Sequence, residues 1–151
     1  MTHIARRTVL LLAAIMLILT QVGCGSGGKT IVRGRVITGT VGQAIATSAE
    51  DVRFEEPGLP GMDVAVLARG GSVSRGRGVY AKVTTDEFGD FELVFPSGTF
   101  PSDAVEIHVT GEGVFTARST TYMPTMGGRL LCIVIPRPGY VAPERNPGPQ
   151  E

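Results

Sequence analysis

The sequence predicts an all-β fold, a single seven-stranded β-sandwich, on three observations. Valine, isoleucine, threonine and phenylalanine occur in short runs that alternate with polar residues, as in strands that bury one face. Turn residues separate these runs at a spacing of about ten residues, which is typical of β-sandwiches. The 21 glycines and 10 prolines disfavour long helices.

The strands are expected within residues 30–136, which we assign to one domain. The expected strands are residues 30–38, 62–68, 79–85, 91–95, 105–109, 113–121 and 128–135. In the third strand, Val79, Ala81 and Val83 are expected to face the core, and Tyr80 is expected to face solvent. The last run, Leu130 to Ile135, has no polar alternation, which predicts a strand that lies in the middle of a sheet or is covered on both faces.

Three connections stand out between these strands. Asp86 to Asp90 predicts a tight turn in which Gly89 adopts a positive φ. Residues 39–60 are expected to form a long acidic loop with at most one short strand, at residues 41–47. Residues 70–78 form a glycine-rich, basic connection. The candidate binding residues of the last two loops are Glu50, Asp51, Glu55 and Glu56, and Arg69, Arg75 and Arg77.

The first 24 residues have the three parts of a secretory signal: Arg6-Arg7, an apolar run from Val9 to Leu19, and the small-residue exit Val22-Gly23-Cys24. The apolar run is too short for a stable bilayer span. The exit resembles the bacterial lipobox, although Gln21 replaces its usual leucine. We therefore expect residues 1–23 to be a lipoprotein signal peptide, Cys24 to carry a lipid, and residues 24–29 to be a flexible tether. The alternatives are a soluble secreted protein and an uncleaved anchor.

This signal places the mature protein in a bacterial cell envelope, anchored to a membrane and facing the periplasm or the exterior. The chain has 14 basic and 14 acidic residues, a balance that argues against nucleic acid as a partner. The expected partners are the membrane, through the lipid, and an envelope protein or glycan. Residues 137–151 are rich in proline and are expected to be a disordered tail.

Three motifs in chain order carry a resemblance to a known family. They are Gly34-Arg35-Val36, then Leu59-Pro60-Gly61-Met62-Asp63-Val64-Ala65-Val66, then Thr85-Asp86-Glu87-Phe88-Gly89-Asp90-Phe91. Together they resemble the carboxypeptidase regulatory-like domain, a relative of transthyretin, over residues 30–136. The resemblance implies a seven-stranded Greek-key sandwich of the prealbumin type and a non-catalytic module with a binding or structural role. The chain departs from the family in a longer insertion at residues 37–59 and in the segment 101–104.

Catalysis, metal and cofactor are not expected. His108 is the one histidine after the signal, whereas the related hydrolases and dioxygenases need several, and its place between Ile107 and Val109 predicts a solvated side chain. Asp86, Glu87 and Asp90 lack the spacing of a calcium loop. A small transthyretin-like hydrolase and a soluble secreted carrier of a small ligand remain the alternative functions.

Cys132 lies among apolar residues, which predicts a buried and inert thiol. A disulfide between Cys132 and Cys24 in a soluble exported protein is the alternative.

Overall fold

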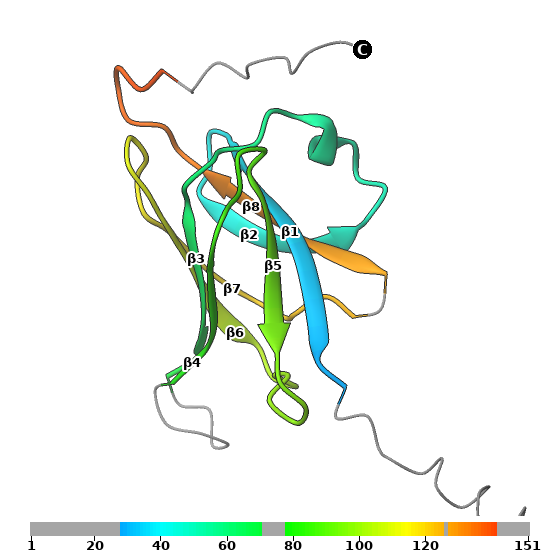
Figure 1. Cartoon of the computed structure of the whole chain (residues 1–151). Coiled ribbons are helices and arrows are strands. Elements are labelled where there is room, and N and C mark those ends of the chain that lie inside the picture. Colours follow the sequence, from blue (N-terminus) through cyan, green and yellow to red (C-terminus); the bar gives the residue numbers. More distant parts are fainter. Residues whose placement is uncertain (1–27, 71–77, 126, 142–151) are drawn as a thin grey trace, which may run out of the picture.

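Two four-stranded sheets pack face to face in the computed structural model, which describes residues 28–70, 78–125 and 127–141 (Figure 1). The all-β prediction is confirmed, and the two sheets have the arrangement of a β-sandwich. The described residues form eight strands and one 3₁₀ helix, η1, rather than seven strands. These elements are β1 (Thr30–Thr38), β2 (Gln43–Ser48), η1 (Val52–Glu55), β3 (Asp63–Ala68), β4 (Val79–Thr84), β5 (Asp90–Phe95), β6 (Val105–Thr110), β7 (Ala117–Thr121) and β8 (Gly128–Val134).

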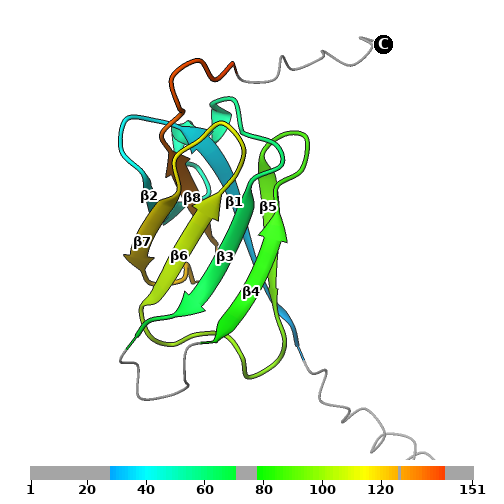
Figure 2. The same cartoon turned by 90° about the vertical axis from the view of Figure 1, so that its left-hand side faces the viewer.

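The strand order is β2-β8-β1-β5 in one sheet, here called sheet A, and β4-β3-β6-β7 in the other, sheet B. All neighbouring strands are antiparallel except β1 and β8, which run parallel. The sheets also approach each other at their edges, where β2 lies beside β7 and β4 lies beside β5 (Figure 2). At the first of these edges, Ser119 Oγ donates a 3.2 Å hydrogen bond to the carbonyl of Ala44.

The main core lies between the sheets and follows the predicted alternation. Its inward-facing side chains include Val64 and Val66 of β3, Phe91, Leu93 and Phe95 of β5, and Val105, Ile107 and Val109 of β6. These residues occupy every second position of their strands, so one face of each strand is buried.

A second, smaller core covers the opposite face of sheet A. Ile37 of β1 and Leu131 and Ile133 of β8 are buried there under Phe54 of η1, with Ile45 packed at their side. Leu130, Cys132 and Val134 of β8 belong instead to the main core. The prediction that this strand is covered on both faces is therefore confirmed.

The acid-rich stretch is more ordered than expected. Within residues 39–60 the chain forms β2, which pairs with β8, and then η1, whose Phe54 is 7% exposed. β2 overlaps the one short strand that the sequence allowed at residues 41–47, and it brings the strands among the described residues to eight rather than seven. The sequence pattern missed η1 because its single apolar anchor, Phe54, gives no periodicity.

The first two side chains of β4 point to the opposite faces from those predicted. The β3–β4 register shifts between Val66 and Leu67, so that Leu67 pairs with Val79 and Val66 pairs with Ala81. This irregularity reverses the alternation, as β-bulges do. Val79 is 61% exposed and Tyr80 packs against the main core, while Ala81 and Val83 face inward as predicted.

The region around the last strands also differs in detail. The strand expected at residues 113–121 is confined to β7, and Val114 forms an isolated bridge with Pro136. Beyond Pro136, the backbone N–H of Arg137 donates to the carbonyl of Gly113 at 2.8 Å, and Tyr140 packs against the core. The first residues of the expected disordered tail thus lie on the sandwich, and residues 142–151 fall outside the described part. Across residues 28–70, 78–125 and 127–141, no helix has the length and apolar character needed to span a membrane.

Candidate functional site

The second and third motifs of the sequence meet at the buried side chain of Thr85. Thr85 Oγ1 donates to the carbonyl of Leu59 at 2.7 Å and accepts from the backbone N–H of Met62 at 2.9 Å. The backbone N–H of Thr85 also donates to the carbonyl of Met62 at 2.9 Å. One side chain therefore fixes the turn before β3 against the β4–β5 hairpin.

The hairpin turn is built as predicted. Asp86 Oδ1 accepts from the backbone N–H groups of Phe88 and Asp90, each at 2.9 Å, so the aspartate stabilises its own turn. Gly89 has a φ of 77°, which confirms the predicted positive value. The sequence did not indicate how closely this turn approaches the preceding chain: a Cβ on Gly89 would lie 2.3 Å from the nitrogen of Leu59 and 2.5 Å from Gly58.

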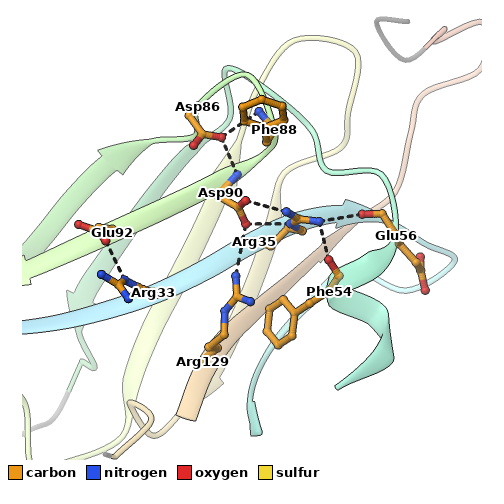
Figure 3. A network of polar contacts seen from close by, with 9 residues as sticks. All are labelled: Arg33, Arg35, Phe54, Glu56, Asp86, Phe88, Asp90, Glu92 and Arg129. Atoms are coloured by element: carbon orange, nitrogen blue, oxygen red, sulfur yellow. Dashed lines mark hydrogen bonds and ion pairs between the residues drawn. The ribbon is translucent and has the colours of Figure 1, made fainter. Parts of the chain in front are cut away.

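An arginine–aspartate network extends from this hairpin across the outer face of sheet A (Figure 3). Arg35 of β1 donates through Nε and Nη2 to the two carboxylate oxygens of Asp90 at 2.8 and 2.6 Å, which is a bidentate pair. Its Nη1 donates to the carbonyls of Phe54 at 2.5 Å and Glu56 at 3.2 Å. The hydrogen bond to Asp90 raises the pKa of Arg35, against the opposing effect of burial. Arg35 thus joins β1, β5 and η1.

Arg129 of β8 completes the network from the other side. Its guanidinium carbon lies 3.9 Å from the centre of the Phe54 ring, a cation–π contact, and its Nη2 lies 3.3 Å from Asp90 Oδ1. The Nε of Arg129 is buried without a hydrogen-bond partner among the described residues. The two arginines and Phe54 together hold η1 over the second core.

An open groove of about 590 Å³ lies beside the network. Arg33, Glu92 and Thr84 line it, together with Asp86, Asp90 and Arg129. Arg33 Nε and Glu92 Oε1 are 2.8 Å apart, and both side chains are largely exposed. Its charged side chains are of both signs, and four of them are paired: Arg33 with Glu92, and Arg129 with Asp90.

Of the four predicted acidic residues, one has a structural role and the other three lie on the surface. Asp51 caps η1: it accepts from the backbone N–H and side chain of Arg53 at 3.1 and 2.6 Å and from Thr47 at 2.8 Å. Hydrogen bonds from Arg53 and Thr47 hold the pKa of Asp51 well below its usual range. Glu50, Glu55 and Glu56 have exposed side chains.

Arg69, the one predicted basic residue among the described residues, is not brought to the acidic stretch. Arg69 is exposed just after β3, at the end of the sandwich where β1 begins, whereas η1 covers the far half of β1 (Figures 1 and 2). Arg75 and Arg77 lie outside the described residues, as does Cys24. Arg69 and the acidic stretch therefore belong to separate surfaces.

The histidine and the cysteine have ordinary environments. His108 Nε2 lies within hydrogen-bond distance of Glu106 Oε1, at 2.7 Å, and the histidine side chain is 25% exposed, so it is half-buried rather than fully solvated as expected. The hydrogen bond to His108 lowers the pKa of Glu106. Cys132 is a free, fully buried thiol whose burial raises its pKa to about 12, which confirms the prediction of a buried thiol.

Within the part of the chain that the structure describes, no three histidine, cysteine, aspartate or glutamate side chains are grouped so as to hold a metal ion. Comparison of the chain with protein-family models, with curated proteins and with solved structures gave no match.

The buried and exposed arginines of β1 provide a test of the network. Arg35→Met is expected to lower the free energy of unfolding by about 2–3 kcal/mol, because it leaves Asp90 and the carbonyl of Phe54 without their main donor. Arg33→Met, the matched control on the same strand face, is expected to change it by less than about 1 kcal/mol. Urea unfolding measures both values. Equal losses would show that Arg35 does not hold η1.

Proposed function

We propose that the protein is a non-catalytic β-sandwich module that a lipid on Cys24 anchors to a bacterial envelope membrane, where it has a binding or structural role. The basic start, the short apolar run and the Val22-Gly23-Cys24 exit support the anchor. The resemblance of the three motifs to the carboxypeptidase regulatory-like domain supports the class of module, of the transthyretin-like kind.

The observation that carries this proposal is that the polar motif residues make their hydrogen bonds within the fold. Thr85 and Asp86, the polar residues that the resemblance singles out, direct their side-chain oxygens to backbone groups of the hairpin and of the turn before β3. Gly89 lets the same two segments touch. These contacts lie within the fold, so the motif residues maintain the sandwich. The motif therefore favours a module whose specificity resides in its loops.

The length of the tether limits how far the start of β1 can lie from the membrane. Cys24 to Thr30 is six residues, which reach about 20 Å at most when fully extended. The start of β1 is therefore held near the membrane, together with Arg69, which follows β3 at the same end of the sandwich. Basic residues at that height gain favourable interaction with anionic lipid headgroups.

The opposite half of the sandwich faces away from the membrane in this arrangement. Glu50, Glu55 and Glu56 are exposed there, on and beside the helix η1 that Arg35 and Phe54 fix in place. A rigid acidic segment of this kind suits an envelope protein or glycan that presents basic or hydroxyl groups. We assign partner binding to this segment and membrane contact to the basic connection.

Replacing Cys24 tests the anchor. Cys24→Ala is expected to abolish incorporation of labelled palmitate and to leave an unprocessed precursor, because the thiol that accepts the lipid is gone. Cys132→Ala is the matched control: its thiol is fully buried in the folded domain, so label incorporation is expected to persist. Labelling, gel mobility and membrane fractionation measure the outcome, and labelled palmitate on Cys24→Ala would contradict the proposal.

A further inference from the structure

The chain enters and leaves the sandwich at opposite ends of two neighbouring strands. It enters through Lys29 at the start of β1 and, after β8 ends at Val134, it passes Val141 at the far end of the molecule (Figure 1). β1 and β8 are adjacent and parallel, with residues 34–38 paired to residues 130–134. From this geometry we infer that the domain is built to carry tension between the chain that enters at Lys29 and the chain that leaves at Val141.

Pulling these two points apart slides β1 and β8 past each other in opposite directions along their axes. The hydrogen bonds of a parallel ladder are evenly spaced along the pair, so such sliding loads them all together. A pair opened from one end breaks its bonds one after another instead. Forced unfolding depends on the barrier to leaving the native state, and loading the bonds together keeps that barrier high.

β1 is also held on its other side and at its far end. Its first half pairs with β5, from Thr30 opposite Phe95 to Arg35 opposite Asp90, and the bidentate Arg35–Asp90 pair crosses these strands. Beyond that pair, the N–H of Val36 donates to the carbonyl of Gly89, and the N–H of Gly39 donates to the carbonyl of Val134, both at 2.9 Å. The strand that receives the pull is thus bonded along its whole length.

The two cores oppose the same sliding. Val32 and Val36 of β1 are buried in the main core, and Ile37 is buried on the opposite face in the second core. A slip of one residue would exchange the two faces of the strand and place Arg35 against the main core. Intermediate registers are therefore unfavourable, which makes the resistance cooperative.

The biological role of this resistance rests on the proposed function. With a lipid on Cys24, tension would run from the membrane through β1 and β8 to whatever holds the chain beyond Val141, so the module would act as a mechanical link in the envelope. The resistance itself does not depend on the lipid, so a failed force experiment and a failed lipidation experiment are separate results.

Single-molecule pulling on the full chain tests the inference. Cys24→Ser removes the only thiol of the sequence besides Cys132, which stays buried. Handles are attached to Lys29→Cys with Val141→Cys in one variant and to Lys29→Cys with Ser97→Cys in the other. Ser97 follows β5 beside the start of β1, so the second attachment opens the β1–β5 pair from its end. We expect the unfolding force at the same pulling speed to be at least about twofold higher for the first attachment, because its bonds are loaded together. Equal forces, or a higher force for the second attachment, would overturn the inference.

A side-chain variant separates the pulling path from general stability. Arg35→Met is expected to lower the unfolding force in the Lys29–Val141 attachment by a larger fraction than in the Lys29–Ser97 attachment. The matched control is Lys82→Met, which breaks a 2.9 Å ion pair to Asp63 between β4 and β3, away from the pulled strands, and it is expected to leave the force nearly unchanged. A loss of the same fraction in both attachments, or an equal loss with Lys82→Met, would contradict the role of the β1 contacts.

Discussion

Replacing Gly89 with alanine is expected to lower the free energy of unfolding by at least about 3 kcal/mol, which exceeds the usual cost of one strained residue. Gly89 has a φ of 77°, and a Cβ there would meet the backbone of Leu59 at 2.3 Å and of Gly58 at 2.5 Å. The hairpin would have to move away from the turn before β3. That movement would break the bond between the carbonyl of Gly89 and the N–H of Val36 and disturb both bonds of the Thr85 side chain.

Gly98 supplies the matched control for this prediction. Its φ of 74° is nearly the same, but a Cβ there would have nothing within 4 Å. Gly98→Ala is expected to lower the free energy of unfolding by about 1–2 kcal/mol, because only the left-handed backbone conformation opposes the added Cβ. Chemical denaturation of both variants measures the difference, and equal costs would show that the close approach of Gly89 to the preceding turn does not matter.

Phe91→Ala is expected to lower the free energy of unfolding by about 3–5 kcal/mol through the cavity it leaves. Phe91 is 4% exposed, and its ring lies over Gly34 of β1, where a side chain would meet the ring at 2.2 Å. The ring of Phe91 therefore occupies the space that a side chain at position 34 would need. This contact links the first motif of the sequence to the third.

Phe88, in the same hairpin, is the control for the loss of Phe91. It is 48% exposed, so Phe88→Ala is expected to cost less than about 1 kcal/mol, as surface changes usually do. Thermal and urea unfolding of the two variants should differ clearly. Similar losses of stability in the two variants would show that the side chain of Phe91 does not lie in the core.

The strands with regular alternation could be predicted from the sequence because their pattern is local. β3, β5 and β6 bury alternate residues as expected, and the Asp86–Asp90 turn has its predicted glycine conformation. The alternation of β4 failed at Val79 because a shift in register depends on the partner strand, which the sequence of β4 does not contain.

The site depends on contacts between distant segments, and most of it could not be predicted. Arg35 is 55 residues from Asp90 and 19 from Phe54, and the burial of Phe54 depends on side chains of β1 and β8. One signal was available: Arg33 and Arg35 alternate on the first expected strand. Asp90 and Glu92 alternate where the predicted turn joins the fourth, as in an antiparallel pair with opposite charges.

The structure also changes what the acidic stretch is expected to do. A solvated loop could be deleted with little change in melting temperature, and residues 50–56 were expected to be such a loop. Phe54 closes the second core and Asp51 caps η1, so deletion of the whole segment would destabilise the fold. Partner binding is better tested by changing the exposed Glu50, Glu55 and Glu56 to glutamine, which leaves Asp51 and Phe54 in place.

Mass spectrometry of the amino terminus of the protein purified from envelope membranes tests the proposed module most directly. The account predicts a mature chain that begins at Cys24 and carries the added mass of a lipid on that residue, followed by the unmodified Gly25 to Lys29 tether. A mature chain that begins at Gly25 or Ser26, or a Cys24 without lipid, would contradict it.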